Sequence, residues 1–400
     1  MGGVEAALIA AIVAAPATVE PWLAYRDWLL ARGDRRGEWI RLALEGGDEA
    51  SRRQLISEKS LLTPRLYEQS HLLRFRWWRG FIEAAALIGA MDDPPTFETI
   101  EALFADPHAA LISTLGLSHP ITATVPLWQA VLAIERPTIT RLRASDLGAG
   151  LLEVEAKLPR LKSLVLEGVS LRVRMHRHTE SRVASAERIA HDGLRELTCG
   201  ARSCLALIAG NFELPNLASL TWALTDDAEI FDKELAPRGY ELFTSSSSIL
   251  HHPPVRLLEL DLVKGVVWER ESRSIRAGCE IELLESCAVL LQLQRLKLSL
   301  LAGAGVTLER LLARAGSFRH LESIEVAVGG HENLPRTEVD TLNAELDRAL
   351  PNTKLVVDWD GLVTRNLTAP STLPAPVDSQ SRNKDGRIDA LGRWISGERQ

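Results

Sequence analysis

Cysteine is scarce in this sequence, and its scarcity excludes a disulfide-stabilised scaffold. The chain has 400 residues and four cysteines, far fewer per residue than small secreted domains that are held together by disulfides. Cys199, Cys204, Cys279 and Cys287 form C-x4-C and C-x7-C pairs, which match the ligand spacing of structural zinc sites poorly. We therefore expect reduced cysteines in the core, no bound metal and a cytoplasmic protein.

Long apolar runs are also absent, as is an excess of positive charge. No stretch reaches the roughly 18 apolar residues of a membrane-spanning helix. The apolar segment 6–17 follows Glu5 and ends near Pro16, without the basic residues that open a secretion signal. The net charge of −7 argues against a dedicated nucleic-acid-binding protein, which usually has a basic surface. The sequence predicts neither a membrane partner nor secretion.

The motifs of common enzyme classes are missing too. The sequence contains no G-x-x-x-x-G-K-S/T phosphate-binding loop, no G-x-S-x-G nucleophile elbow and no H-E-x-x-H zinc motif. Neighbouring carboxylates, as at Asp226–Asp227, lack a partner pattern for acid–base catalysis. We predict a non-catalytic protein without a cofactor, although a catalytic site assembled from distant residues would leave no motif.

Residues 1–92 instead have the pattern of a small all-α domain. Apolar spacing predicts helices over residues 4–15, from Glu20 onward and over residues 35–45. Gly33 fits the left-handed residue that ends the second helix, and Asp34 fits the N-cap of the third. Five tryptophans fall here and suit a core of large side chains, the alternative being an aromatic recognition surface. They are Trp22, Trp28, Trp39, Trp77 and Trp78.

The same region carries a specific run of residues. From Leu23 to Leu42 it reads L-x-Y-x-D-W-L-x-x-x-G-D-x-R-G-E-W-I-R-L, and WWRGFIEAAAL follows at 77–87. With these motifs the region resembles the repeat-companion domain of planctomycetes and myxobacteria. The resemblance covers about a quarter of the chain. It implies a bacterial protein in which this domain precedes leucine-rich-type repeats, and it implies no known activity. We expect residues 1–92 to cap those repeats.

Residues 93–360 repeat one phrase, L-x-x-L-x-L, with other apolar residues allowed. The central residues lie 22–40 positions apart and are Leu115, Leu142, Leu164, Leu197, Leu220, Leu260, Leu296, Ile324 and Leu355. Helical patterns fill gaps between them, at 97–105, 125–135, 180–190, 306–316 and 338–350.

Strand, turn and helix at this period resemble leucine-rich repeats. We therefore expect an α/β solenoid of about nine repeats, with a parallel sheet on its concave face and helices on its convex face. A doubly wound sheet is the alternative fold. The asparagine that usually follows the last leucine of a repeat is absent, since Val169, Arg202, Thr225, Gly265 and Leu301 stand there.

Residues that flank the central leucine should face the open side of the sheet, because side chains alternate along a strand. We predict that a protein partner binds there as on a scaffold. The candidate residues are Arg141, Arg143, Glu167, Thr198, Thr221, Asp261, Lys297 and Glu325. The alternative reading is that Asp261, Lys297 and Glu325 only neutralise one another across neighbouring strands. Another function class is phosphate or nucleic-acid binding by an arginine-rich patch, formed by Arg141, Arg143, Arg172, Arg174 and Arg177.

Two further segments stand outside the repeat pattern. Residues 226–254 contain a run of serines and predict a surface loop. Residues 361–386 are rich in Pro, Ser and Thr and predict a flexible linker. Residues 387–400 form either a short helix, which could dock through Trp394, or a disordered tail. The sequence leaves the oligomeric state and the identity of the partner open.

Overall fold

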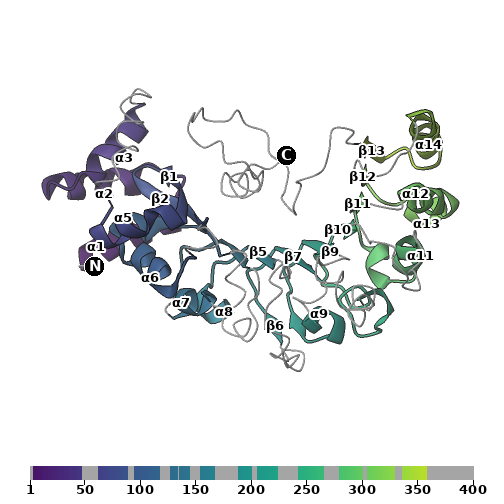
Figure 1. Cartoon of the computed structure of the whole chain (residues 1–400), viewed down its shortest axis with the longest axis horizontal. Helices are drawn as coiled ribbons and strands as arrows, with labels where there is room; N and C mark the ends of the chain where they lie inside the picture. The colour runs from purple at the N-terminus through teal and green to yellow at the C-terminus, as the bar shows by residue number, and fades with distance from the viewer. Residues whose placement is uncertain are drawn as a thin grey trace. The chain divides into compact units, whose positions relative to one another are not determined.

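The chain folds as a mixed α/β protein (Figure 1). The computed structural model describes residues 3–46, 62–88, 94–117, 127–133, 135–144, 154–166, 188–200, 205–223, 242–264, 279–300, 304–328 and 336–357. These residues divide into two compact units. Unit 1 contains those up to Leu142, and unit 2 contains those from Arg143 onward.

Unit 1 begins with the three expected helices, α1 (Gly3–Ala14), α2 (Glu20–Ala31) and α3 (Arg36–Glu45). Gly33 adopts the left-handed conformation (φ +68°). Around it the N–H of Gly33 donates to the carbonyl of Leu30 and that of Asp34 to Leu29, at 3.0 and 2.9 Å, as in a Schellman motif. The Asp34 carboxylate accepts the backbone N–H of Arg36 at 3.0 Å. The predicted end of α2 is therefore confirmed, whereas α3 has Arg35 at its N-cap position and Asp34 bonds the first turn from one residue earlier.

The prediction that residues 1–92 are all helical is wrong for their last part. After α5 (Pro64–Gln69) and the short helix η2 (Ser70–Leu72), strands β1 (Leu73–Trp78) and β2 (Phe81–Leu87) form an antiparallel hairpin. Arg79 and Gly80 both have positive φ, +50° and +81°, the conformation that tight two-residue hairpin turns require. Nearly every residue of β2 is buried, so the alternation that marks a strand is absent from its sequence.

The sheet of unit 1 continues beyond the hairpin. Helices α6 (Phe97–Ala105) and η3 (Pro107–Leu111) lead to β3 (Thr114–Gly116), which pairs in parallel with β2. Helix α6 covers the predicted residues 97–105 and starts with a capping box between Thr96 and Thr99. Helix α7 (Trp128–Leu132) and strand β4 (Arg141–Ala144) follow, and the chain passes into unit 2 within β4.

Unit 2 is built on parallel strands that neighbour one another in chain order. They are β5 (Ser163–Leu166), β7 (Glu196–Gly200), β9 (Ser219–Ala223), β10 (Glu259–Lys264), β11 (Arg295–Leu300), β12 (Ser323–Val328) and β13 (Thr353–Val357). The connecting helices include α8 (Val154–Lys157), α9 (Leu205–Ala209), α11 (Cys279–Glu285), η7 (Ala288–Leu291), α12 (Ala304–Ala313), α13 (Ala315–Phe318) and α14 (Arg336–Ala349). Figure 1 shows α11 to α14 together on one side of β10–β13.

Each recurrence of the L-x-x-L-x-L phrase forms a strand, from β3 to β13. The central leucines from Leu115 to Leu296, and Ile324 after them, are buried. Along β5 to β12 the residues that flank them are partly exposed, apart from the exposed Arg295. One face of this sheet therefore packs into the core under the helices, and the other carries partly exposed side chains.

Two local predictions for unit 2 are wrong where the structure describes them. The pattern at 180–190 predicted a helix, but β6 (Ile189–Ala190) instead pairs with β8 (Phe212–Glu213), and Ile189 is buried. Residues 180–187 lie outside the described residues. The surface loop was predicted for residues 226–254, of which 226–241 lie outside the described residues, and in the remainder Phe243 and Leu250 are buried. The hydroxyls of Ser245 and Ser247 there donate to the carbonyl of Ile208 at the end of α9. The serine run thus satisfies a helix end.

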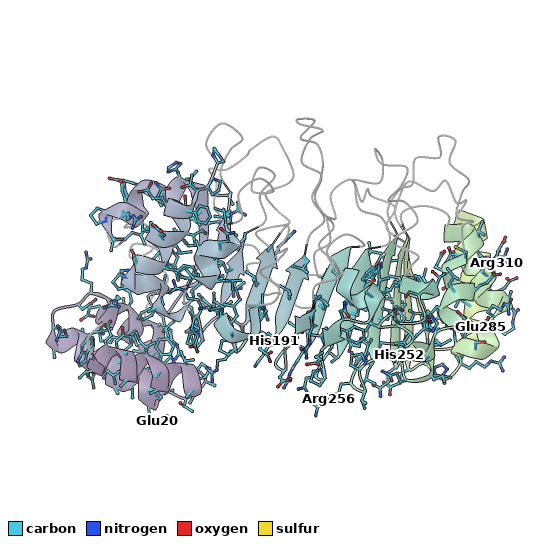
Figure 2. All side chains as sticks on the ribbon, turned by 90° about the horizontal axis from the view of Figure 1, so that it is seen from below. Glu20, His191, His252, Arg256, Glu285 and Arg310 are labelled. Atoms are coloured by element: carbon cyan, nitrogen blue, oxygen red, sulfur yellow. The ribbon has the colours of Figure 1, made fainter. Side chains whose placement is uncertain are left out.

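A ladder of polar side chains links successive segments of unit 2 at the edge where the strands begin. Three of its members stand three residues before a strand. Asn216 donates to the carbonyl of Asp192, Gln292 to those of Pro254 and Leu257, and His320 contacts that of Leu290, over 2.7–2.9 Å. His191, which Figure 2 shows at the same edge, donates through Nε2 to the carbonyl of Leu158 and accepts the N–H of Gly193.

This ladder adds side-chain hydrogen bonds to carbonyls that precede the strands, two of which, those of Leu158 and Pro254, also accept a backbone N–H. The positions after the strands, where asparagine was missing, lie outside the described residues.

Candidate interaction surface

Five of the predicted partner-binding residues lie in one row across the exposed face of unit 2. Parallel pairing places Thr198 beside Thr221, Thr221 beside Asp261, Asp261 beside Lys297 and Lys297 beside Glu325. All five side chains are partly exposed. The register extends the row to Val165 at one end and to Lys354 at the other. We call this set, from Thr198 to Glu325, the central row.

A second row runs beside it, two residues earlier on each strand. It consists of Ser163, Glu196, Ser219, Glu259, Arg295 and Ser323. Arg295 and Glu259 form an ion pair at 2.8 Å on neighbouring strands. Because both side chains are well exposed, this pair contributes little to stability.

Charges in the central row pair as expected in one place. Lys297 and Glu325 form an ion pair at 3.2 Å, with side-chain exposures of 34% and 38%. The expected mutual neutralisation of Asp261, Lys297 and Glu325 is therefore confirmed for the last two. Asp261 differs: within the described residues no basic nitrogen lies within 4 Å of its carboxylate, and its hydrogen-bond donor is the Ser299 hydroxyl at 3.3 Å.

The environment of Asp261 is electrostatically unusual. Burial raises the pKa of its carboxyl to about 6, although the Lys297 charge and the Ser299 hydrogen bond act in the opposite direction. The negative charge of Glu325 adds to the increase. A carboxylate at the centre of the sheet face is thus short of compensating positive charge.

The other predicted partner-binding residues do not join this row. Arg141 is partly exposed on β4, but Arg143 is buried, with 4% of its surface exposed, so its predicted place on an open face is wrong. Strand alternation fails there because three consecutive residues of β4 are buried. Burial lowers the pKa of Arg143 to about 10. Glu167 and Trp394 lie outside the described residues.

The arginine-rich patch is not supported as a phosphate site by what the structure describes. Arg172, Arg174 and Arg177 lie outside the described residues, and Arg143 is buried. Among the described residues, no group of three or more His, Cys, Asp or Glu side chains is arranged to hold a metal ion. Burial raises the pKa of the Cys287 thiol to about 11, which disfavours the reactive thiolate.

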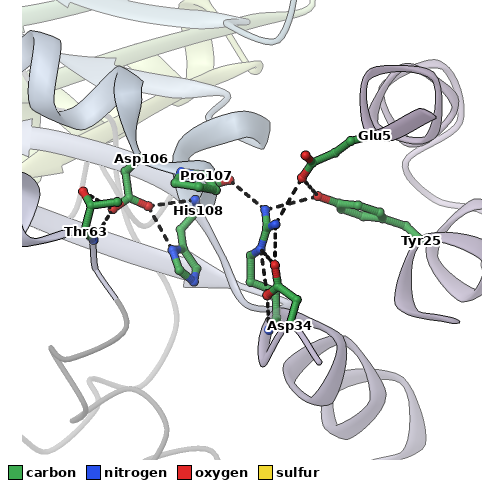
Figure 3. A network of polar contacts seen from close by, with 8 residues as sticks. Glu5, Tyr25, Asp34, Thr63, Asp106, Pro107 and His108 are labelled. Atoms are coloured by element: carbon green, nitrogen blue, oxygen red, sulfur yellow. Dashed lines mark hydrogen bonds and ion pairs between the residues drawn. The ribbon is translucent and has the colours of Figure 1, made fainter. Parts of the chain in front are cut away.

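Unit 1 contains a buried polar network centred on Arg36, a residue of the conspicuous run at 23–42. The Arg36 side chain is 7% exposed. It pairs with the Asp34 carboxylate at 2.6 Å and with Glu5 at 3.1 Å. It also donates to the Tyr25 hydroxyl at 3.2 Å and to the Pro107 carbonyl at 3.4 Å. Figure 3 shows these contacts converging from α1, α2, η3 and the start of α3.

The partners of Arg36 in this network also bond one another. The Tyr25 hydroxyl donates to Glu5 at 2.9 Å, and burial raises the pKa of Tyr25, so the hydroxyl keeps its proton. Burial alone would raise the pKa of Asp34, but the hydrogen bonds and charge of Arg36 outweigh it and hold that pKa below its usual value. Since its charged groups satisfy one another, the network stabilises the packing of helices rather than binding a ligand.

A second buried carboxylate fixes the start of η3. Asp106 accepts hydrogen bonds from the backbone N–H and hydroxyl of Thr63 at 2.8 and 3.0 Å. On its other side it accepts the backbone N–H of His108 at 2.8 Å and lies 2.9 Å from its Nδ1 (Figure 3). Burial acts to raise the pKa of Asp106, but these contacts hold it below the usual range.

Of the five tryptophans in residues 1–92, two are buried and two, Trp28 and Trp77, are partly exposed. Trp22 and Trp39 are buried, and Trp28 packs against the core formed by α1, α2 and α3. Trp78 is 37% exposed and stacks on the Arg79 guanidinium, which also lies over Trp22. The prediction of a tryptophan core is therefore confirmed for Trp22, Trp39 and Trp28, whereas Trp77 packs on Trp39 and Trp78 lies at the surface.

Sequence reasoning missed the network and the ladder for different reasons. The residues of the run at 23–42 stood out, but contacts of Arg36 with Glu5 and Pro107 are not encoded in local spacing. The ladder did leave a signal, because Asn216, Gln292 and His320 each stand three residues before a strand. Aligning the repeats on their strands would have revealed it.

Comparison with known proteins adds little to this picture. No family model matches the chain, and no curated protein does. A solved structure of a protein from Bacteroides fragilis is similar, with a TM-score of 0.41 and 14% sequence identity, over 70% of this chain and 74% of that one. Among the helices of the described residues, none has the length and apolar character to cross a membrane.

Proposed function

We propose that this chain is a non-catalytic scaffold that binds a protein partner through the partly exposed face of the sheet in unit 2. In this proposal the sheet belongs to a leucine-rich-repeat solenoid, and residues 1–92 are a repeat-companion domain that caps it. The protein acts in the cytoplasm.

Strand order supports the solenoid. Strands β5, β7, β9, β10, β11, β12 and β13 neighbour one another in chain order, without the reversal that a doubly wound sheet requires. At the start of each strand of this sheet from β7 to β12, two consecutive backbone N–H groups donate to one carbonyl before the preceding strand. For example, the N–H groups of Glu322 and Ser323 both donate to the carbonyl of Gln294, as those of Gln294 and Arg295 do to Leu258. In a solenoid, similar structural units stack so that each unit contacts only its neighbours.

The observation that carries the functional proposal is the central row itself. It aligns threonines and charged side chains from five adjacent strands on a face whose reverse side is buried under helices. Polar side chains on rigid strands can bind a partner segment with little loss of conformational entropy. Large concave faces of repeat proteins serve as binding surfaces for the same reason.

A pair of matched variants tests the proposal. Thr221→Arg places a long cation at the centre of the row, whereas Ala313→Arg adds the same side chain to the exposed end of α12. The tagged full chain and both variants are used to enrich proteins from the native cytosol. Each enriched protein is then purified and titrated directly.

We expect a partner that binds the unmodified chain and Ala313→Arg equally, and Thr221→Arg at least tenfold more weakly, because the arginine blocks the contact. Circular dichroism checks that both variants fold. Equal affinity for all three proteins would overturn the proposal.

A further inference from the structure

Strands β5–β12 of unit 2 place more acidic than basic side chains on the exposed face of the sheet. Strands β5–β12 place four carboxylates on it, from Glu196, Glu259, Asp261 and Glu325, and two basic side chains, from Arg295 and Lys297. Both bases are engaged by carboxylates on neighbouring strands, Arg295 by Glu259 and Lys297 by Glu325. These two ion pairs therefore leave Asp261 without a basic partner in the central row.

Asp261 is the carboxylate left over at its centre. Its position is two residues after Glu259 on β10, and Thr221 stands next to it on β9. On β11 it faces Lys297, but the ammonium of Lys297 lies against Glu325 instead. Ser299 hydrogen bonds one oxygen, Oδ1, and within the described residues the other oxygen has no hydrogen-bond partner.

An under-compensated carboxylate in a partly buried position favours a cation. Its own solvation is already reduced, so bringing a positive charge to it costs less desolvation than at an exposed acid, and the attraction is less screened. Two threonines on one side and a paired lysine on the other leave this carboxylate as the strongest available anchor in the central row.

We infer that Asp261 is the anchor point for a basic side chain, lysine or arginine, on the protein partner. This inference rests on the proposed function and names the partner's chemistry: a segment that carries a cation where it crosses β10. The two threonines of the central row, Thr198 and Thr221, donate and accept hydrogen bonds along the same segment.

The pKa of Asp261 supplies an independent readout. This pKa stands at about 6, raised by burial and by the charge of Glu325, while the Lys297 charge and the Ser299 hydrogen bond act to lower it. Glu259 and Arg295 are the other charged groups on the surrounding strands. A bound cation stabilises the ionised form and lowers this pKa, and each unit of decrease corresponds to tenfold stronger binding to the ionised form. Binding therefore weakens as the pH falls through 6.

The first experiment uses a minimal probe and the full chain with ¹³C-labelled aspartate carboxyls. The probe is N-acetyl-arginine amide, and its neutral twin is N-acetyl-citrulline amide. Asp261→Asn identifies the resonance and removes the charge, and Glu309→Gln on α12 removes an equal charge from the helical side.

We expect the Asp261 carboxyl to titrate near pH 6, and its pKa to decrease with the arginine probe but not with the citrulline probe. Glu309→Gln should behave like the unmodified chain. An Asp261 pKa near 4, or an unchanged pKa at saturating arginine probe, would overturn the inference.

The second experiment uses the partner that the unmodified chain enriches from the cytosol. Thr221→Arg is the negative control for binding of that partner. Asp261→Asn should bind it at least tenfold more weakly at pH 8 and should abolish the loss of affinity between pH 8 and pH 5. If Thr221→Arg disrupts binding but Asp261→Asn does not, the inference fails and the proposed function stands. If Asp261 binds the arginine probe while Thr221→Arg leaves partner binding intact, the proposed function fails instead.

Discussion

At the scale of single residues, Arg36 joins segments that are distant in the sequence. Its guanidinium contacts Glu5 on α1, Tyr25 on α2 and the carbonyl of Pro107 on η3, while Asp34 fixes it beside the start of its own helix. A planar group with five donors suits this position, and lysine could not reproduce the same set of bonds.

Replacing Arg36 should be strongly destabilising. Arg36→Met leaves two partly buried carboxylates unpaired, and we expect a loss of about 3–5 kcal/mol in the free energy of unfolding, measured by urea denaturation. Arg41→Met, on the same helix, is the control, because Arg41 is exposed and pairs with Glu38 and Glu45 at the surface. Similar losses for the two variants would contradict the role of the network.

Asp106 should make stability depend on pH. Its folded-state pKa lies below the unfolded value of about 3.9, so its contribution is fully present above that value. The contribution is lost as the pH falls through the lower, folded value. Asp34 acts in the same direction.

We expect Asp106→Asn to lose about 2 kcal/mol at pH 7, since several hydrogen bonds to a charged acceptor are weakened. Urea titrations followed by tryptophan fluorescence check this, because the Trp77 ring contacts His108. The difference between variant and unmodified protein should shrink toward pH 3. A difference independent of pH would show that the Asp106 charge is unimportant.

At the scale of elements, the strands of unit 2 were predictable and the hairpin of unit 1 was not. Apolar residues at every second position predict a strand that is buried on one face, and this pattern recurs in every repeat. The central residues from Leu115 to Ile324 are buried as this pattern predicts. In β2 the alanines at 84–86 are buried on both faces, so their sequence carries helix propensity and no alternation.

The sequence predicted which residues share the exposed face of the sheet, because it predicted the strands. Alternation placed Thr198, Thr221, Asp261, Lys297 and Glu325 on one face, and pairing in register confirms that row. Alternation could not reveal which charges pair, because that depends on side-chain conformation across strands. It also failed for Arg143, where both faces of the strand are buried.

The hairpin turn offers a test at this scale. Gly80 has φ +81°, and a Cβ there would lie 2.5 Å from the Cβ of Trp39 on α3. Gly33 has φ +68° with open space around it. We expect Gly33→Ala to cost about 1–2 kcal/mol, from the left-handed backbone alone. Gly80→Ala should cost clearly more, because Trp39 must also move.

Thermal unfolding of both variants measures the difference. Equal costs would show that the hairpin turn does not pack tightly against α3.

At the scale of the whole molecule, residues 1–92 are tied to the rest of unit 1 by β2. This strand pairs with β3 through Ala84–Thr114 and Ala86–Gly116. Removing residues 1–92 should therefore expose the edge of β3 and the apolar side chains beneath it, and an exposed edge promotes aggregation. We expect a 93–360 fragment to be insoluble or unfolded, judged by size-exclusion chromatography and circular dichroism. A soluble, folded fragment would contradict the capping role.

The central claim is that a protein partner contacts the sheet face of unit 2. Site-specific photocrosslinking in living cells tests it most directly, with benzoylphenylalanine placed at Thr221 on the face and, in a second protein, at Ala313 on α12. The account predicts a crosslinked partner from position 221 and none from position 313. A partner captured from position 313, with none from position 221, would contradict it.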